Sequence, residues 1–460
     1  MKILEGLFDN MVLQRNRRNR SDAAFTGESR ADGIVTVRAT RRGRALAGWN
    51  GAAAGHAARG KLGGRIRGLP AGGPYDIEIT VTNADRQTLD SKRIRNVLVG
   101  DVWLLAGQSN MEGVGYLKDA AKPHPMVRAF FMDDRWGVAK DPIHNLSQAV
   151  DPVHPDISGG PPQRDRHAGV GPGVAFGQEM HRRTGVPQGL IPCAHGGTSM
   201  TQWDPAGKSL GSHSLYGAML RRLRKNGGRA AGLVWSQGCS EVTAADAPLY
   251  TGRMKALARA VRRDIGDPRL PIVAVQISRA LLVGASDAKW WNSIQDQQRR
   301  LPDAIPRFFV APTIDLELDD MIHISGKDQN RLGARLAQAM RVLRGDRKAG
   351  KPPIRLKSVT VEKNPLNGWK VIRVKFENVM GRLRTGDRPN GFDLVEGQPL
   401  SRIYRIDLER NAAVIRTRLE AGEAPGAMLY YGYGAVPYCN ITDAADRSLP
   451  AFGPIEPAKT

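Results

Sequence analysis

The pattern of apolar and polar positions changes character twice along the chain. Over the first 95 residues, apolar and polar positions alternate in short stretches, such as 33–39 and 75–82. Turns rich in Gly, Pro and Asn separate these stretches. Alternation with a period of two is typical of strands that bury one face. Residues 1–95 are therefore predicted to form a β domain.

The middle of the chain, from 96 to 345, alternates apolar stretches with amphipathic helical patterns. The predicted buried strands are 97–105, 189–194, 231–235, 271–277 and 307–311. The predicted helices are 173–184, 214–225, 247–264, 288–300 and 326–343. Apolar strands joined by helices indicate a parallel sheet covered on both faces, a fold of the α/β class. In such sheets the chemistry lies at the carboxyl ends of the strands.

Alternation returns near the carboxyl terminus, for example in 369–376 and 413–417, after a charged linker at 345–353 that contains Gly and Pro. The predicted plan is thus three domains, 1–95, 96–345 and 351–460, in the order β, α/β, β.

Charge narrows the classes of partner. Lys and Arg number 68 against 45 Asp and Glu, a net charge of +23, but the basic residues lie in short runs along the whole chain. A nucleic-acid binder concentrates its charge on one face and carries a recognisable module, and none is found, so no nucleic-acid partner is predicted. The charge would still attract anionic sugars.

Other composition signals are negative. No apolar stretch reaches the roughly 18–20 residues of a membrane helix, so no membrane partner is predicted. Three cysteines are too few and too scattered for a disulfide framework or a metal site, and no metal or other cofactor is predicted. The first residues lack the apolar core of a signal peptide, which leaves a cytoplasmic location or a trimmed leader open. Oligomeric state is also open.

Chemistry-bearing residues follow the predicted strands. Ser109, just after the first strand of the α/β region and preceded by Gly107, would be presented at a strand-to-helix corner as a nucleophile, with a helix N-cap as the alternative. After the second strand, Gly196 and Gly197 would let a main-chain N–H approach an oxyanion, with an ordinary turn as the alternative. The side-chain amide of Gln237, after the third strand, could supply a further donor or merely satisfy loop backbone.

The last segment before the final helix contains Asp320 and His323. In such a turn the carboxylate can reach the imidazole and hold its tautomer, while the other ring nitrogen faces a Ser hydroxyl. A surface turn with an isolated His is the alternative. The joint occurrence of these residues with Ser109 and two donor loops favours a hydrolase.

Four blocks of this sequence resemble the SGNH hydrolases, and more closely the sialate O-acetylesterase and carbohydrate esterase family 6 group. The blocks are 107–111, 191–203, 235–238 and 320–323, and the segments 7–15 and 99–103 extend the likeness toward the amino terminus. The resemblance implies a flavodoxin-like three-layer SGNH hydrolase domain, flanked by an N-terminal β-sandwich-like domain and a C-terminal β domain. It also implies a metal-independent esterase.

The same resemblance assigns catalytic roles. Ser109 would be the nucleophile, His323 the general base and acid, and Asp320 its orienter, with Asp319 as the alternative orienter. The oxyanion hole would comprise the N–H of Ser109, the N–H of Gly197 (Gly196 is the alternative) and the amide of Gln237.

Gln108, Asn110, His195 and Glu241 are predicted to contact substrate, and filling of the loop is the alternative for His195. One position departs from the family: where relatives often have Glu, this chain has Cys239, and Glu241 falls where Asn or Asp is usual. Cys239 is thus an alternative, second nucleophile.

The predicted function is removal of O-acetyl groups from carbohydrates through an acetyl-enzyme. The partner is an acetylated carbohydrate, with O-acetyl sialic acid first and acetylated xylan or another polysaccharide as the alternative. A carbohydrate-binding protein with a weakened site is the rival outside this enzyme class.

Overall fold

The computed structural model describes residues 1–158, 168–364, 366–419 and 427–459. The chain divides into two compact units. The first comprises 1–196, 202–234 and 259–270, and the second comprises 197–201, 235–258 and 271–460. This division does not follow the predicted domain boundaries near 95 and 350, which stay predictions.

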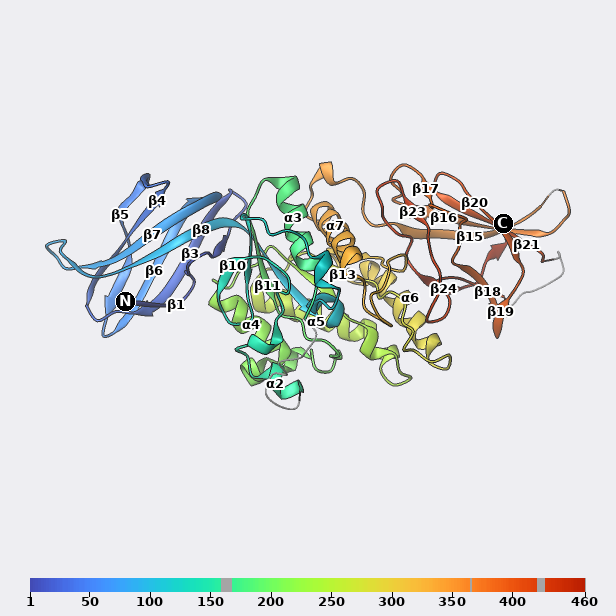
Figure 1. Cartoon of the computed structure of the whole chain (residues 1–460), viewed down its shortest axis with the longest axis horizontal. Helices are drawn as coiled ribbons and strands as arrows, with labels where there is room; N and C mark the ends of the chain where they lie inside the picture. The colour runs from blue at the N-terminus through green and yellow to red at the C-terminus, as the bar shows by residue number, and fades with distance from the viewer. Residues whose placement is uncertain (159–167, 365, 420–426, 460) are drawn as a thin grey trace. The chain divides into compact units, whose positions relative to one another are not determined.

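The first unit begins with antiparallel strands (Figure 1). Their order in the sheet is β1-β3-β6-β5-β4-β7-β8, and β2 pairs in parallel with β8. Their bounds are β1 (Lys2–Glu5), β2 (Val12–Gln14), β3 (Arg20–Glu28), β4 (Gly33–Arg41), β5 (Arg44–Ala58), β6 (Lys61–Pro70), β7 (Gly72–Thr82) and β8 (Thr88–Gly107). In β7 the side chains of Tyr75, Ile77, Ile79 and Val81 are buried, and the residues between them are only partly so. The predicted N-terminal β region is confirmed.

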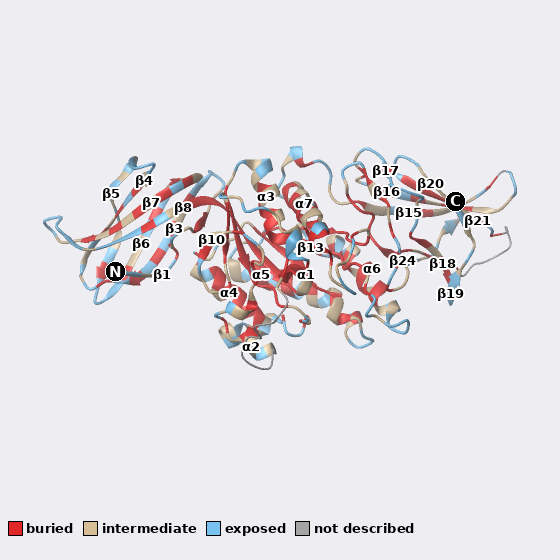
Figure 2. Cartoon of the chain, viewed as in Figure 1, coloured by how far each residue is buried: buried red, intermediate tan, exposed pale blue. Residues whose placement is uncertain are grey.

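Strand β8 joins this region to the parallel sheet. Its first half pairs antiparallel with β7, whereas its second half pairs in parallel with β11 (Gln188–Pro192), so that Asp101 lies opposite Gln188. From Val97 to Gly107 every residue of β8 is buried, as expected of a strand covered on both faces (Figure 2). On its other side β11 pairs in parallel with β9 (Val127–Phe130), which pairs antiparallel with β10 (Trp136–Val138).

The helices of the first unit are α1 (Ser109–Glu112), α2 (Val153–Ser158), α3 (Pro172–Thr184) and α4 (Leu215–Lys225). Helix α3 packs on β9 and β11. A Cβ at Gly177 of this helix would lie 2.7 Å from Val127, so a glycine is needed for the close approach. Helix α3 begins at Pro172, and Gly171 is its N-cap residue.

The second unit contains a parallel pair, β13 (Ile272–Val275) and β14 (Phe308–Ala311), with α6 (Ala288–Ala304) and α7 (Gly326–Leu343) packed against β14. The boundary between the units falls inside β12 (Gly232–Ser236) and α5 (Tyr250–Ile265). The predicted α/β character is confirmed, and the helices agree with the predicted ranges to within a few residues. Short 3₁₀ segments are 117–119, 146–148, 205–213, 239–241, 247–249 and 347–349.

Mainly antiparallel sheets make up the carboxyl-terminal part of the second unit, and β15 pairs in parallel with β25. The larger sheets have the orders β20-β21-β16-β15-β25 and β19-β18-β22-β24, and β17 pairs with β23. Between them lies a core that includes Phe376, Phe392, Tyr431 and Phe452. The bounds are β15 (Arg355–Lys363), β16 (Lys370–Glu377), β17 (Leu383–Arg384), β18 (Phe392–Glu396), β19 (Gln398–Leu400), β20 (Ile403–Leu408), β21 (Ala412–Thr417), β22 (Met428–Tyr431), β23 (Thr442–Asp443), β24 (Phe452–Ile455) and β25 (Ala458–Lys459).

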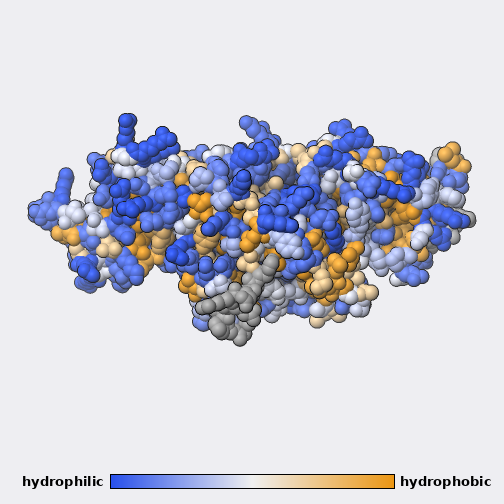
Figure 3. All heavy atoms as spheres, viewed as in Figure 1, coloured by the Kyte–Doolittle hydropathy of each residue, from blue (hydrophilic) through white to orange (hydrophobic). Residues whose placement is uncertain are grey.

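Several of the basic runs lie on the surface, since Arg17, Arg18, Arg41 and Arg42 are exposed. Hydrophilic residues are prominent on the face shown in Figure 3. The run 221–225 is an exception. Arg222 is fully buried, and its guanidinium donates to the carbonyls of Pro192 and Phe130 and pairs with Asp134 at 3.0 Å. This arginine therefore ties α4 to the ends of β9 and β11. None of the described helices is both long and apolar enough to cross a membrane.

A buried carboxyl near α3 gives a pH-dependent prediction for stability. Burial raises the pKa of Asp141 to about 7, and the N–H of Gly171 only partly offsets that cost. Since its pKa is higher in the folded than in the unfolded chain, stability from this group is present below about pH 4 and is lost as the pH rises toward 7. The full loss is on the order of 4 kcal/mol. Asp141→Asn should therefore raise the melting temperature more at pH 8 than at pH 5.

Thermal unfolding followed by circular dichroism at both pH values tests this expectation. Asp85→Asn is the control, because Asp85 is an exposed residue of the same unit. An equal shift at pH 5 and pH 8 would mean that ionisation of Asp141 is not the cause.

Candidate active site

Ser109 lies at the corner where β8 ends and α1 begins. Gly107, the last residue of β8, has φ of 128°, a conformation that favours glycine. Gln108 is the N-cap residue and Ser109 is the first residue of the helix, so the N-cap alternative for Ser109 is wrong. Ser109 itself is partly exposed, whereas its neighbours Gln108 and Asn110 are only 4% and 8% exposed. Any contact of these two side chains with substrate stays a prediction.

Glu112, one turn after Ser109, is a residue that the sequence interpretation missed. Its carboxylate is buried and accepts a hydrogen bond from the backbone N–H of Gly196. The backbone N–H of His195 in turn donates to the carbonyl of Gly107 at 3.1 Å. These two bonds attach the loop after β11 to the segment that carries Ser109. The sequence offered only an acidic residue three positions after Ser109, which is not a specific signal.

His195 is almost fully buried, with 1% of its surface exposed. Its Nδ1 lies 2.9 Å from Nδ1 of His154, and the two rings stack with centroids 5.2 Å apart. This environment agrees with the alternative in which His195 fills the loop. The predicted contact with substrate is not tested by it.

The space that a side chain at Gly197 would occupy is open. The residue is exposed, and a Cβ built on it would meet no atom within 4 Å. Its φ of 73° is in the left-handed region, where glycine carries no steric penalty. The predicted role of the Gly197 N–H as an oxyanion donor stays a prediction.

Gln237 and Glu241 form a buried pair in the second unit. The amide nitrogen of Gln237 donates to the carbonyl of Thr198 at 3.3 Å and to Oε2 of Glu241. Oε1 of Glu241 accepts from the backbone N–H of Met200 at 2.6 Å. Burial raises the pKa of Glu241 above its usual range, and these two donors oppose the rise.

Two consequences follow for the predicted roles. Glu241 is 0% exposed and both of its carboxylate oxygens accept internal hydrogen bonds, which is not the setting expected of a substrate contact. An amide nitrogen has two N–H groups, and Gln237 uses both inside this loop. To bind an oxyanion, Gln237 would have to give up one of these two hydrogen bonds. The bond to Thr198 is the longer of the two and therefore the one that we expect to break.

Asp320 and His323 lie on the loop between β14 and α7. Nδ1 of His323 is 2.6 Å from Oδ2 of Asp320, and Oδ1 of Asp320 accepts from the backbone N–H groups of Ile322 and His323. Burial tends to raise the pKa of Asp320, but the bonds from His323 and the backbone outweigh it and lower that pKa below its usual value. Asp319 instead accepts from the N–H of Gly326 at the start of α7, at 2.8 Å. The partner of His323 is therefore Asp320 and not Asp319.

Comparison with known proteins adds the chemistry that these features leave open. The family profile described as carbohydrate esterase, sialic acid-specific acetylesterase, matches residues 99–342, more than half of the chain. The chain belongs to this family. A probable carbohydrate esterase from Arabidopsis thaliana is 31% identical over 260 residues, which cover 52% of this chain and 89% of that relative. The protein is thus a carbohydrate acetylesterase, an ester hydrolase.

One solved structure shares the fold over nearly the whole length of the esterase. The crystal structure of a carbohydrate acetylesterase from Xanthomonas citri superposes with a TM-score of 0.70 and 21% identity, covering 98% of each chain. Since this match extends beyond residues 99–342, both flanking β regions belong to the shared architecture.

Cys239 is the residue that the sequence interpretation left open as a second nucleophile. Burial and the nearby Glu241 carboxylate raise the pKa of its thiol to about 12. A thiol reacts as its thiolate, so at neutral pH Cys239 is held in the unreactive form. This disfavours the alternative of a second nucleophile.

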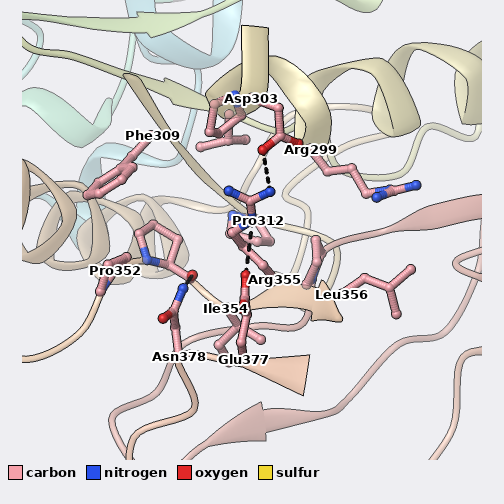
Figure 4. A pocket seen from close by; sticks show the side chains of 14 residues that line it. Arg299, Asp303, Phe309, Pro312, Pro352, Ile354, Arg355, Leu356, Glu377 and Asn378 are labelled. Carbon is pink, nitrogen blue, oxygen red and sulfur yellow. Dashed lines mark hydrogen bonds and ion pairs between the residues drawn. The ribbon is translucent and has the colours of Figure 1, made fainter. Parts of the chain in front are cut away.

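A cavity of about 200 Å³ lies elsewhere in the second unit (Figure 4). It is lined by the end of α6, by β14 and by the start of β15, and Arg355 crosses it to pair with Asp303 and, at 3.6 Å, with Glu377. The lining of this cavity includes none of the predicted catalytic residues. Within the described ranges, no three His, Cys, Asp or Glu side chains cluster in a way that could hold a metal ion.

Proposed function

We propose that this esterase removes O-acetyl groups from sugars by a serine mechanism, with Ser109 as nucleophile, His323 as general base and acid, and Asp320 as orienter. The observation that carries the proposal is the 2.6 Å bond between Asp320 and Nδ1 of His323. It leaves Nε2 of the ring to exchange protons with the reacting groups.

The proposed reaction has two halves. Ser109 Oγ bonds to the acetyl carbonyl carbon while His323 takes the hydroxyl proton. The resulting oxyanion accepts hydrogen bonds from the N–H groups of Ser109 and Gly197 and from the amide of Gln237. The bond from the acetyl carbon to the sugar oxygen then breaks, and His323 returns the proton to that oxygen. In the second half, water loses a proton to His323 and attacks the acetyl-enzyme. The bond from the acetyl carbon to Ser109 Oγ then breaks, His323 returns the proton to Oγ, and acetate is released.

O-acetyl sialic acid is the proposed substrate, and acetylated xylan or a related polysaccharide is the alternative. The family description names sialic acid, and a net charge of +23 favours an anionic sugar. The finer fold belongs to the same proposal: a flavodoxin-like, three-layer SGNH domain over 96–345, between a β-sandwich-like domain over 1–95 and a β domain over 351–460. The parallel pairing of β8, β11 and β9, and of β13 and β14, supports it.

Acetate release from O-acetyl sialic acid, acetylated xylan and an aryl acetate tests the proposal. We expect the highest kcat/KM for the sialic acid, with a decline as salt screens the attraction between the basic protein and the anionic sugar. Release from xylan alone would select the polysaccharide alternative. Binding of these sugars without turnover would contradict the proposed reaction.

A further inference from the structure

The loop after β11 and the segment after β12 share one buried carboxylate. Glu241 accepts from Met200 N and from the amide of Gln237. Met200 is three residues after Gly197, and Gln237 also donates to Thr198, the residue after Gly197. Glu241 is therefore connected to two oxyanion donors of the proposed reaction. It bonds directly to the amide of Gln237, and it is connected to Gly197 through the backbone that leads to Met200.

The backbone carbonyl of Gln237 and its side-chain amide have different hydrogen-bond partners. The carbonyl of Gln237 accepts from Tyr250 Oη at 3.0 Å and from Gln298 Nε2 at 2.9 Å. The amide nitrogen has only the bonds to Glu241 and to Thr198, and its carbonyl oxygen is buried without a partner among the described residues. The orientation of the amide thus depends on Glu241 and, through a longer bond, on Thr198.

We propose that Glu241 is a positioning residue, which holds one N–H of Gln237 and the backbone of Met200 so that the other N–H of Gln237 and the N–H of Gly197 converge on the oxyanion. During the reaction the Gln237 N–H exchanges the 3.3 Å bond to Thr198 for the oxyanion, while the bond to Glu241 persists. This inference rests on the proposed function. It also gives Glu241 a task other than the predicted contact with substrate.

The position of Glu241 explains how the site tolerates Cys239. The segment 239–241 is a 3₁₀ turn after Gly238, whose φ of 146° bends the chain. In this turn it is the third residue whose carboxylate is buried against Gln237 and Met200, so an acidic group is present at the donors although residue 239 is a cysteine.

Glu241→Gln is the variant that tests the proposal. The new side chain keeps an oxygen for Met200 N but turns an NH₂ toward the NH₂ of Gln237, and two donors cannot bond. We expect kcat to fall by about 10- to 100-fold, with KM changed less than about threefold. Complete loss of one oxyanion donor typically lowers kcat by about 10²- to 10³-fold, which sets the upper limit. The concentration of active enzyme is set by titration with a fluorophosphonate, and the melting temperature is measured in parallel.

A double-mutant cycle with Gln237→Met separates positioning from a general structural role. If Glu241 acts through Gln237, adding Glu241→Gln to Gln237→Met should lower kcat less than about twofold further. Asp246→Asn is the matched control, since Asp246 lies on the same loop and pairs with Arg253 at 2.9 Å. That control should keep its activity.

Three results would overturn the proposal. The first is an unchanged kcat in Glu241→Gln, and the second is an equal fold-decrease in kcat whether residue 237 is Gln or Met. The third is a decrease in activity that disappears when the rate is divided by the concentration of active enzyme. Failure of the proposed function looks different. In that case the unmodified protein and Ser109→Ala release acetate equally slowly, and Glu241 has no reaction to position.

Discussion

Ser109→Ala is expected to reduce acetate release to background, with kcat lower by at least about 10⁴-fold. The proposed reaction forms its covalent bond through Ser109 Oγ, so the variant lacks the group that attacks the acetyl carbon. Cys239 does not substitute, because burial and Glu241 raise the pKa of its thiol to about 12. The measurement is acetate release from O-acetyl sialic acid and from an aryl acetate, so that a poor choice of sugar does not hide activity.

A second readout of the same variant identifies the nucleophile independently of the substrate. Ser109 in the unmodified protein should be labelled by a fluorophosphonate, and peptide mass spectrometry should place the label at that residue. Ser286→Ala, at an exposed serine on a loop of the second unit, should keep both activity and labelling. Label on another residue, or undiminished release by Ser109→Ala, would remove Ser109 from the mechanism.

The longer helices were predictable because they contain enough residues for the apolar pattern to repeat. Helices such as α3 and α7 span several turns, so their apolar stripes repeat often enough to define their ends. Strands β9 and β10 were missed, since Arg128 interrupts the apolar run of β9 and the three residues of β10 are too few to show a period. They become strands only because β11 offers β9 a partner, and β9 then offers one to β10.

The candidate site was predictable where it depends on strand ends and short spacings. Ser109 follows a buried strand, and the three-residue separation of Asp320 and His323 lets a turn bring them together. Asp320 was preferred to Asp319 on this spacing alone, and the sequence could not show that the carboxylate of Asp319 would instead accept from the N–H of Gly326. Such local competition for donors is a property of the folded loop.

Buried carboxylates were the weakest part of the sequence interpretation. Glu112 was not considered, and Glu241 was expected to contact substrate, yet both accept backbone N–H bonds from the loop after β11. A charged residue is most often exposed, so sequence alone favours the surface. These carboxylates are buried because loop donors distant in the chain compensate for lost hydration, and that pairing exists only in the tertiary structure.

Asp320→Asn is expected to lower kcat by about 10²- to 10⁴-fold at pH 7, with little change in KM. The carboxylate fixes the tautomer and orientation of His323 through a 2.6 Å bond, and it stabilises the imidazolium that forms when Ser109 loses its proton. The amide of Asn still accepts hydrogen bonds but carries no charge and selects no single tautomer. Asp319→Asn is the matched control, because the neighbouring carboxylate bonds to Gly326 and not to His323.

The pH dependence of kcat/KM tests whether Asp320 acts as a carboxylate in this role. Because the pKa of Asp320 is lowered in the folded protein, its contribution is present above the usual aspartate pKa near 4 and is lost only as the pH falls through the lower folded value. Protonation of Asp320 should therefore cause no decrease in kcat/KM of the unmodified enzyme between pH 5 and pH 8. The Asp320→Asn enzyme should have a lower kcat/KM than the unmodified enzyme at every pH in that range. An Asp320→Asn enzyme within about threefold of the unmodified one at pH 7, or an Asp319→Asn enzyme impaired to the same extent, would show that Asp320 does not orient the base.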